Sequence, residues 1–392
     1  MTSEWKKVSL GDITELVIDY RGKTPKKLGG DWSDSGYRAL SAKNIKTGHI
    51  VQLDTIRYVD EEMYQKWMKD EIQRGDIIIT SEAPFGQIYF WDSDEKIVLS
   101  QRLFCVRIKK DYHPQFVYYY MTTDAFQGEM DGRATGTTVV GLRQPELMKC
   151  ELYCPDYETQ KQIASVLSSI DAKININNKI NDNLQQHASA LYGKFFPYGI
   201  ADELPVGWRV GTVGEIVEIH DSKRIPLSGA QREKMEKRIY PYYGAASLMD
   251  YVDEYIFDGK YLLLGEDGTV VDDAGYPILQ YVWGQFWVNN HAHILTGKMG
   301  FNVESLLLLF KRTPVKAIVT GAVQPKISQG NLRSIQVVIP PIEELDAFNE
   351  LICPIFDQIR QNHDQNIALA ALRDALLPKL MSGEVDVSTI QV

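Results

Sequence analysis

The hydrophobic pattern of the chain alternates between two kinds of segment. Short apolar runs at residues 76–80, 97–99 and 261–264 are separated by glycine turns, and such runs are typical of buried strands. Two longer segments carry apolar residues spaced alternately four and three apart, which is the spacing of helices that pair along a seam. The pattern therefore predicts compact mixed α/β domains with substantial sheet, separated by long helices.

Each helical segment opens at a proline. Pro155 is followed by Glu158, and Pro340-Pro341 is followed by Glu343-Glu344, an arrangement that favours a helix N-terminus. The residues predicted to form the seam are Ile163, Leu167, Ile170, Ile174, Asn177, Asn181, Leu184, Ala188 and Leu191 in the first segment, and Phe348, Ile352, Ile355, Ile359, Asn362, Asn366, Leu369, Arg373 and Leu376 in the second.

Asparagines interrupt the seam at the same places in both segments, because Asn177 and Asn181 correspond to Asn362 and Asn366. A buried polar pair would lower stability but fix the register of two packed helices. In the alternative interpretation the asparagines face solvent, and a local stutter brings two isoleucines into the seam, Ile176 and Ile180.

Pro354 departs from the helical pattern of the second segment. A proline inside a helix costs about 3 kcal/mol and kinks it. We therefore expect the second helix to start late or to bend at this residue.

The chain contains an internal repeat. Residues 5–13 match residues 208–216 at an offset of 203, and residues 135–191 match residues 320–376 at an offset of 185 without a gap. The chain is thus a tandem duplication whose first copy carries about 18 extra residues in its middle. This repeat predicts a globular domain at 1–154, a helix at 155–196, a second domain at 197–339, a second helix at 340–385 and a tail at 386–392.

Composition narrows the class of protein. The 392 residues have the apolar content of a globular protein, and no stretch approaches the roughly 20 apolar residues that cross a bilayer. The N-terminus lacks the apolar core of a secretory signal, so we expect a cytoplasmic protein. Four cysteines without paired zinc spacing predict ordinary thiols. The net charge of −10 argues against autonomous nucleic-acid binding, yet residues 21–46 hold seven basic and two acidic residues.

Catalytic motifs are missing from the sequence. It has no Asn/Asp-Pro-Pro-aromatic motif for methyl transfer to a base amino group and no phosphate-binding loop for ATP. Asp156, Glu158 and Lys161 are spaced like a nuclease motif but follow the proline of a helix start. His291 and His293 would share one face of a strand. They could ligate a metal only with further partners, so packing or a DNA-facing role is the stronger interpretation.

Several segments, in this order and with helices between the repeats, carry a family resemblance. They are VSLGDI at 8–13, LPVGW at 204–208, YPYYGAAS at 240–247, FWVNNHAH at 286–293, PPIEE at 340–344 and LLPKLMSGE at 376–384. Over essentially its whole length the chain resembles the specificity subunits of Type I restriction–modification systems.

This resemblance implies an α+β protein with two similar target-recognition domains separated by two long antiparallel coiled-coil helices, in a pseudo-twofold arrangement. It implies a non-catalytic, sequence-specific DNA-binding subunit in which each domain reads one half of a bipartite target. The implied partners are double-stranded DNA, two DNA methyltransferase subunits and restriction/translocase subunits, with no membrane. S-adenosylmethionine and ATP are then expected on partner subunits and no cofactor or metal in this chain. About 36 helical residues would span roughly 54 Å, more than one turn of DNA at about 34–36 Å, and would set the unread spacer.

Readout requires hydrogen-bonding side chains on rigid domains, with arginine or lysine toward guanine and asparagine or glutamine toward adenine. In the first domain the candidates are Arg21, Lys23, Lys43, Asn44, Arg102 and Arg133. In the second they are Lys223, Arg224, Tyr243, Asn289, Asn290, His291, Gln324 and Lys326. The segments 135–138 and 320–326 are matched loops, so a similar position at the DNA is expected for both. A solvated surface charge is the alternative for each single residue.

Two other classes of function are alternatives to this interpretation. A self-sufficient enzyme fused to a DNA reader would need a catalytic domain for which the chain has no room. A two-headed protein-binding scaffold without DNA readout remains the alternative, because a coiled-coil spacer does not by itself indicate DNA.

Overall fold

The structure of the chain is a computed structural model that describes residues 5–136, 140–321 and 323–387. Thr137 and Thr138 of the predicted loop, and residues 388–392 of the predicted tail, lie outside the described residues. The chain forms two compact units, unit 1 with residues 1–175 and 365–392 and unit 2 with residues 176–364. Each unit therefore combines one globular head with part of both long helices. We name residues 5–154 head 1 and residues 208–339 head 2.

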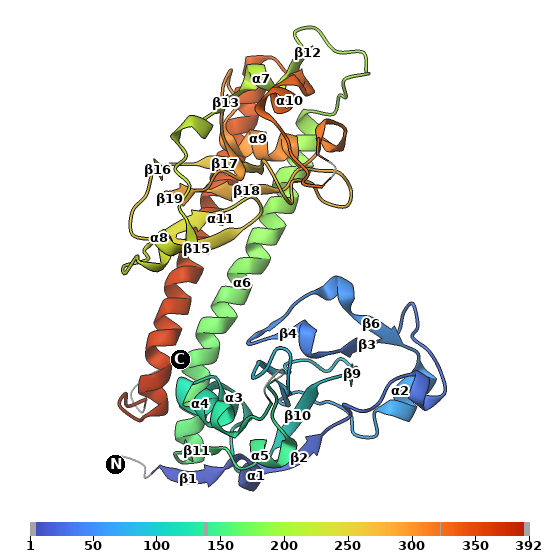
Figure 1. The fold of residues 1–392 in the computed structure, drawn as a ribbon, viewed down its shortest axis with the longest axis vertical. Coiled ribbons are helices and arrows are strands. Elements are labelled where there is room, and N and C mark those ends of the chain that lie inside the picture. Colours follow the sequence, from blue (N-terminus) through green and yellow to red (C-terminus); the bar gives the residue numbers. More distant parts are fainter. Residues whose placement is uncertain (1–4, 137–139, 322, 388–392) are drawn as a thin grey trace. The chain divides into compact units, whose positions relative to one another are not determined.

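The described residues of head 1 form four sheets, one of them the two-stranded pair of β4 (Ile45–Lys46) and β5 (His49–Ile50) (Figure 1). Its first and last strands pair antiparallel, β1 (Lys6–Ser9) with β11 (Glu151–Cys154). A four-stranded sheet has the order β2 (Thr14–Ile18), β10 (Leu103–Ile108), β7 (Ile77–Thr80) and β8 (Ile88–Phe90). A three-stranded sheet has the order β6 (Arg57–Val59), β3 (Tyr37–Leu40) and β9 (Ile97–Leu99), in which β3 and β9 are parallel.

Head 2 repeats this topology. Its end strands β12 (Arg209–Thr212) and β21 (Gln336–Ile339) pair antiparallel. The four-stranded sheet has the order β13 (Val217–Ile219), β20 (Ala292–Gly297), β17 (Tyr261–Gly265) and β18 (Leu279–Val282). The third sheet is β15 (Leu248–Val252), β14 (Tyr240–Tyr243), β19 (Gln285–Val288) and β16 (Phe257–Asp258), again with a parallel central pair. The two heads therefore share one fold, as the sequence repeat predicts.

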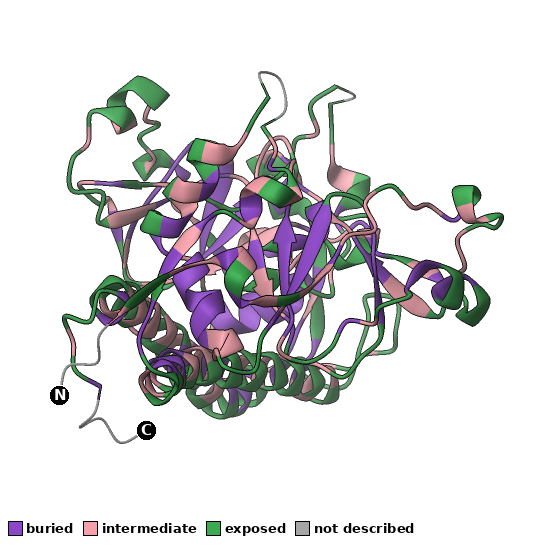
Figure 2. Ribbon diagram, turned by 90° about the horizontal axis from the view of Figure 1, so that it is seen from below, coloured by how far each residue is buried: buried purple, intermediate pink, exposed green. Residues whose placement is uncertain are grey.

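The central sheets are buried on both faces because alternate strand residues point to opposite sides. In head 1, Ile77 and Ile79 pack toward helix α3 (Pro114–Met121), whereas Ile78 belongs to the core beneath the three-stranded sheet. In head 2, Leu262 and Leu264 pack with α9 (Val303–Phe310). Leu263 points the other way and packs against the sheet that contains β19. Figure 2 shows these strands mostly buried and the outer helix turns exposed.

The extra residues of the first copy lie between β3 and β7, where head 2 has a much shorter connection between β14 and β17. This insertion contains η2 (Ala42–Asn44), β4 (Ile45–Lys46), β5 (His49–Ile50), η3 (Leu53–Thr55) and α2 (Glu61–Trp67). The remaining short helices of the heads are α1 (Leu10–Ile13), η1 (Lys26–Leu28), α4 (Asp124–Arg133), α5 (Gln144–Leu147), α7 (Val213–Ile216), η4 (Asp221–Lys223), α8 (Gly229–Glu233), η5 (Lys316–Ile318) and α10 (Gln329–Ser334).

The two predicted long helices are present as α6 (Tyr157–Phe195) and α11 (Ile342–Met381), and they pack antiparallel within each unit. In unit 1, Arg373 forms an ion pair of 2.7 Å with Asp171, which also accepts a hydrogen bond of 2.6 Å from Tyr119 of the head. In unit 2, the rings of Tyr192 and Phe348 lie 5.5 Å apart, edge to face. Every predicted seam residue is buried or half-buried.

The structure has the asparagines in the helix interface. In unit 2 Asn362 donates to the side-chain oxygen of Asn181 at 2.8 Å, and Asn181 donates to the carbonyl of Ile359 at 3.2 Å. Asn177 is fully buried, whereas Ile176 and Ile180 are 52% and 39% exposed. The stutter that would have buried these isoleucines is therefore absent.

The expectation that the second helix starts late at Pro354 is wrong, because α11 is helical from Ile342 onward. Pro354 itself is exposed, so its ring does not disturb the seam. Ile352 and Phe356, on either side of it, are buried in the core of unit 2. Their burial offsets the hydrogen bond that a proline cannot donate.

All four cysteines are free thiols. Burial raises the pKa of Cys150 to about 11 and that of Cys154 to about 12, so both are protonated at neutral pH. Within the described part of the chain, none of the helices combines the length and apolar character that a membrane crossing requires.

Candidate nucleic-acid interface

Four segments meet at one end of the four-stranded sheet in each head. In head 1 the backbone N–H of Ser81, just after β7, donates to the carbonyl of Arg102, and the N–H of Leu142 donates to Ser81. In head 2 the backbone N–H of Glu266 donates in the same way to the carbonyl of His291, and the backbone N–H of Ile327 donates to the carbonyl of Glu266. Because the backbone bonds repeat, Arg102 and His291 occupy equivalent positions in the two heads, and so do Ser81 and Glu266.

An acid and a base lie side by side at this position in both heads. The guanidinium of Arg102 lies 3.1 Å from the Glu82 carboxylate, and both side chains are partly exposed. In head 2 His291 pairs through Nδ1 with Asp267, which follows β17 as Glu82 follows β7. Each pair therefore presents one donor and one acceptor side by side to solvent.

The matched loops, which begin at Thr135 in head 1 and at Thr320 in head 2, lie beside these acid–base pairs. Thr135 and Gly141 form a β-bridge in head 1, as Thr320 and Lys326 do in head 2. Glu82 bridges to Gly141, and Asp267 bridges to Lys326. The loops therefore occupy equivalent places beside the acid–base pair in both heads.

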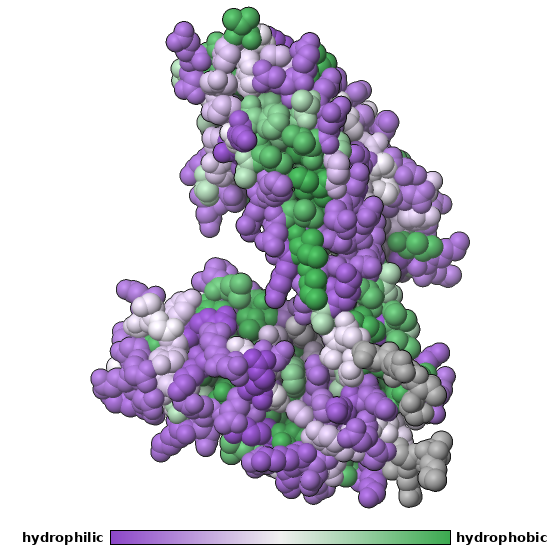
Figure 3. All heavy atoms as spheres, turned by 180° about the vertical axis from the view of Figure 1, so that it is seen from behind, coloured by the Kyte–Doolittle hydropathy of each residue, from purple (hydrophilic) through white to green (hydrophobic). Residues whose placement is uncertain are grey.

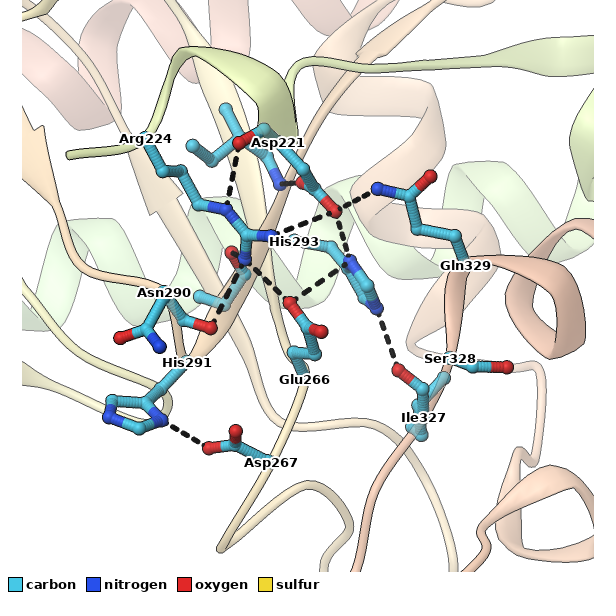
Figure 4. Close-up of polar contacts among 12 residues, drawn as sticks. Asp221, Arg224, Glu266, Asp267, Asn290, His291, His293, Ile327, Ser328 and Gln329 are labelled. Carbon is cyan, nitrogen blue, oxygen red and sulfur yellow. Dashed lines mark hydrogen bonds and ion pairs between the residues drawn. The ribbon is translucent and has the colours of Figure 1, made fainter. Parts of the chain in front are cut away.

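A buried polar network centred on Asp221 supports the end of the sheet in head 2 (Figure 4). One carboxylate oxygen accepts from the backbone N–H of Ile294 at 3.0 Å. The other accepts from His293 Nδ1 and from the Gln329 amide, each at 2.6 Å. Asp221 thus ties the turn after β13 to strand β20 and to helix α10.

His293 and Arg224 hold the carboxylates of this network. His293 is fully buried, and its Nε2 faces the carbonyl of Ile327 at 2.8 Å. Arg224 bonds to Glu266 at 2.6 Å, to the carbonyl of Ala292 at 2.8 Å and to Asp221. The guanidinium of Arg224 therefore bridges the buried Asp221 carboxylate and the partly buried Glu266 carboxylate.

The electrostatics of the network depress the pKa of both carboxyl groups. Burial alone would raise the pKa of Asp221, but hydrogen bonding and charge from His293, with the N–H of Ile294 and Arg224, outweigh burial and lower it. The pKa of Glu266 is likewise lowered by Arg224, His293 and Lys326 against the opposing effect of burial. Both groups are therefore carboxylates at neutral pH.

Head 2 is expected to lose stability in acid. A carboxyl group whose pKa is lower in the folded chain contributes stability above its unfolded pKa, and this contribution is lost as the pH falls through the folded value. With unfolded values of 3.8 for Asp221 and 4.5 for Glu266, the loss should develop below about pH 4.5. Urea unfolding of the whole chain between pH 6 and pH 3, followed by amide hydrogen exchange in β20, measures it.

Asp221→Asn serves as the control for the pH experiment, because an amide cannot titrate. This variant should be less stable at pH 6 and show a shallower pH dependence in β20. Glu304, buried elsewhere in head 2 with a lowered pKa, contributes to the slope that remains. An unchanged slope in the variant would mean that Asp221 is not among the titrating groups.

Head 1 carries a simpler arrangement at the equivalent place. Arg21 binds Asp19 through two hydrogen bonds of 2.9 and 2.8 Å, and its guanidinium lies 4.0 Å from the ring centre of Phe104. Phe104 holds the position on β10 that His293 holds on β20, as the strand registers show. An aromatic ring thus replaces the buried histidine of head 2, and a single partly exposed ion pair replaces the network.

A metal ion is a second possible occupant of the network in head 2. Asp221, Glu266 and His293 offer ligand atoms within 4.8 Å of one another. However, the guanidinium of Arg224 already binds both carboxylates. The site is therefore balanced by its own side chains, and these partners account for His293 as a packing residue.

The other candidates of head 1 fall into two groups. Lys43 is exposed on the insertion, and Arg133 pairs with Glu129 at 3.1 Å beside the loop that begins at Thr135. Lys23, by contrast, donates to the carbonyl of Trp67 and lies over the ring of Tyr20. Its amine is engaged within the head, so we withdraw it as a readout residue.

Asn44 is also withdrawn. It is 1% exposed, its oxygen accepts from Ser41, and its amide donates to backbone and side-chain oxygens of residues 51–55. This side chain closes a turn of the insertion. Because its hydrogen bonds are already made inside the fold, it has none to offer a base.

In head 2 four candidates are exposed around the network: Lys223, Asn290, Gln324 and Lys326. Lys326 lies 3.2 Å from Glu266. Asn289 is 4% exposed and accepts from the N–H of His291, and Tyr243 packs on Phe286. Asn289 is withdrawn because it shapes the turn before His291, whereas Tyr243 is half-buried and stays a prediction.

The acidic partners were not among the predicted residues, although the sequence carried a signal for them. In each copy an aspartate at the end of the second strand is followed within three residues by an arginine: Asp19 by Arg21, and Asp221 by Arg224. Arg143 was also missed. It is exposed and lines, with Arg133 and Glu146, a polar hollow of about 460 Å³ beside the loop.

Comparisons with known proteins agree with the duplicated fold. The family model described as "Type I restriction modification DNA specificity domain" matches residues 2–186 and again residues 205–369. The chain is 23% identical over 421 aligned residues to the Type I restriction enzyme MjaIX specificity subunit of Methanocaldococcus jannaschii, covering 99% of this chain and 95% of that protein. It is 31% identical over 137 residues, 35% of this chain and 34% of that protein, to the putative specificity subunit S.HindORF215P of Haemophilus influenzae.

Among solved structures, the S subunit of a Type I restriction–modification system from M. genitalium is similar in fold. The TM-score is 0.60 at 16% identity, and the match covers 97% of this chain and 96% of that one. This likeness concerns the fold alone.

Proposed function

Since the chain belongs to the family of Type I restriction–modification DNA specificity proteins, we propose that it reads a bipartite DNA target, with each head reading one half. The observation that carries this proposal is the repeated acid–base pair. Arg102 with Glu82, and His291 with Asp267, stand at equivalent positions of two heads that otherwise differ in sequence. Equivalent positions with different side chains are what two readers of different sequences require.

The chemistry of these pairs suits base edges. Arginine donates to the two acceptors of guanine, and a carboxylate can accept from the amino group of cytosine. An acidic partner also holds its arginine or histidine in one direction, which reduces the freedom that binding would remove. The pairs thus combine donor, acceptor and fixed orientation.

The backbone at Arg102 supports a role beyond packing. Its φ is +66°, in the left-handed region that favours glycine. A long charged side chain at such a position carries a conformational cost, and costs of this kind collect at functional sites. Glycine would relieve the strain, and the readout proposed here gives a reason for an arginine side chain at this position.

We further propose that the long helices set the spacer and dock methyltransferase subunits. The hydrogen bond between Asn181 and Asn362 fixes the register of the seam in unit 2. Figure 3 shows apolar side chains exposed along the helical surface between polar ones. By their exposed fractions, the large apolar side chains open to solvent on the two helices include Ile176, Ile180 and Leu351 in unit 2 and Ile367 and Leu372 in unit 1, each at least 39% exposed. Such side chains suit a protein partner.

In this proposal the chain is not itself an enzyme. Methyl transfer from S-adenosylmethionine and ATP-driven steps belong to partner subunits, and those subunits also neutralise part of the DNA charge. A net charge of −10 is then compatible with specific binding by the complex. The alternative, a two-headed protein scaffold, lacks a reason for the repeated donor–acceptor pairs.

The test is protection of DNA by the assembled complex. The purified chain is mixed with its cognate methyltransferase subunit and a randomised duplex library, and bound sequences are recovered. We expect two conserved blocks separated by a spacer of constant length. Recovery of one continuous block, or of no common sequence from a stable protein complex, would favour the scaffold.

Lengthening both helices is expected to lengthen the spacer alone. Seven residues inserted in each helix keep the seam in phase and add about 10 Å, or roughly three base pairs at about 3.4 Å each. Selection from the same library measures the spacer. An insertion of four residues shifts the seam out of phase and should prevent assembly. Changed half-sites, with an unchanged spacer, would contradict the proposal.

A further inference from the structure

Unit 1 contains a cavity of about 610 Å³ between head 1 and the C-terminal turns of α11. Aromatic, apolar and small polar side chains line it, among them Trp5, Tyr120, Thr123, Asp124, Leu377 and Met381. It lies apart from the acid–base pair of head 1, because the two sites share none of the described residues. The readout proposed above therefore makes no use of this cavity.

The corresponding place in unit 2 is filled by aromatic rings. Four residues at the end of α6 and just after it correspond, at the offset of 185, to smaller residues at the end of α11 and just after it: Tyr192 to Leu377, Phe195 to Leu380, Phe196 to Met381 and Tyr198 to Gly383. Trp208, the counterpart of Trp5, has the ring of Phe196 at 6.0 Å and that of Tyr198 at 5.0 Å. In unit 1 the ring of Phe116 lies 6.2 Å from that of Trp5, and Met381 and Gly383 stand at the positions of Phe196 and Tyr198.

A guanidinium also fills the place in unit 2. A Cβ added to Gly193 would lie 2.4 Å from Nη1 of Arg312, so the arginine lies against the helix backbone there. Gly193 corresponds to Pro378, which lines the cavity of unit 1. Arg312 follows α9 as Thr123 follows α3. The first copy thus has a short hydroxyl side chain where the second has an arginine.

The rim of the cavity in unit 1 is acidic. Asp124 is exposed and forms no ion pair among the described residues, whereas Asp374 pairs with Arg373 at 2.8 Å. Their counterparts in unit 2 are the uncharged Thr313 and Ser189. At this place the first copy therefore has smaller side chains on α11, no counterpart of the Arg312 guanidinium and two acidic residues.

We propose that this cavity docks a segment of a partner protein in which an aromatic side chain lies next to an arginine or lysine. The ring would occupy the space that Phe196 fills in unit 2, and the cation would replace Arg312 and meet Asp124. Buried aromatic anchors beside a charged contact are typical of the residues that dominate protein interfaces. The docking does not depend on DNA readout by either head.

A methyl NMR titration of the full chain tests this docking. The probe is the capped dipeptide N-acetyl-Phe-Arg-amide, and the signal is the ε-methyl of Met381, assigned by its loss in Met381→Leu. We expect a saturable shift of this signal. Asp124→Asn should weaken binding of the arginine dipeptide about threefold, the effect of one exposed charge pair. The dipeptide N-acetyl-Phe-Glu-amide should bind the unchanged chain more weakly than the arginine dipeptide binds either the unchanged chain or Asp124→Asn.

Thr123→Arg restores to unit 1 the arginine of unit 2 and should abolish the shift while the other methionine signals stay in place. If Thr123→Arg disturbs folding, the weaker binding expected of Asp124→Asn still tests the proposal. An unmoved Met381 signal at saturating probe, or equal binding of the Glu and Arg dipeptides, would overturn the proposal. Binding that appears only after deletion of residues 388–392 would also overturn the proposal. In that case the C-terminal segment of this chain, and not a partner protein, would be the occupant of the cavity.

Discussion

Asp221→Ala is expected to lower the free energy of unfolding of head 2 by about 3–5 kcal/mol, the usual cost of removing one partner from a buried charge pair. The substitution removes the Asp221 carboxylate from His293 Nδ1 and leaves Glu266 as the carboxylate partner of Arg224. It also removes the acceptor of the Ile294 N–H. Amide hydrogen exchange resolved to β20 of the full chain measures the loss locally.

Asp19→Ala is the matched control, since Asp19 holds the equivalent place in head 1. Its side chain is 23% exposed and pairs with Arg21, whose own side chain is 34% exposed. An ion pair that solvent reaches on both side chains contributes about 1 kcal/mol or less, so head 1 should change little. Equal losses in the two heads would show that burial of the Asp221 network is not the source of its stabilisation.

Arg102→Ala is expected to weaken binding of the cognate duplex by the methyltransferase complex by about 1–3 kcal/mol, or roughly 5–150-fold. The substitution removes the donor of the acid–base pair in head 1 while leaving the second head intact. Base preference should relax in one half of the target only. Competition binding against duplexes with single changes in either half measures both effects.

Arg74→Ala controls for the loss of a positive charge. Arg74 is a half-exposed arginine of the same head, it pairs with Asp92 and Asp94, and it precedes β7 whereas Glu82 follows it. It therefore lies at the opposite end of the strand from the candidate interface. The two variants could instead weaken binding equally, with no change in base preference at either half of the target. Arg102 would then contribute only its positive charge and not readout.

The architecture could be predicted because duplication makes the sequence its own comparison. The offsets of 203 and 185 recur in the paired end strands, since Lys6 and Cys154 pair as Arg209 and Ile339 do. The helices begin at Tyr157 and Ile342, close to the prolines that predicted them. A periodic seam and a repeat are local signals that require no knowledge of tertiary contacts.

The candidate site could be predicted only in part, because side-chain function there depends on contacts distant in sequence. Arg102 was selected as a surface cation, but its partner Glu82 lies across a strand pair that only the fold reveals. Asn44 and Asn289 have suitable amides for adenine, yet the fold buries both. Burial decides between structure and readout, and composition does not encode it for a single polar residue.

Pro354 marks the limit of propensity in the same way. An isolated helix would be broken there at a cost of about 3 kcal/mol. The buried residues of the surrounding turns, Ile352 and Phe356, keep α11 continuous by packing in the core of unit 2. Tertiary packing therefore overrides a strong local preference.

Exchange of one head tests the central claim most directly. Residues 1–154 are replaced with the corresponding head of another member of the family, and methylated sites are mapped across a genome that carries the hybrid complex. The account predicts that one half of the target changes while the other half and the spacer length are retained. A change in both halves together would contradict the assignment of one half-site to each head.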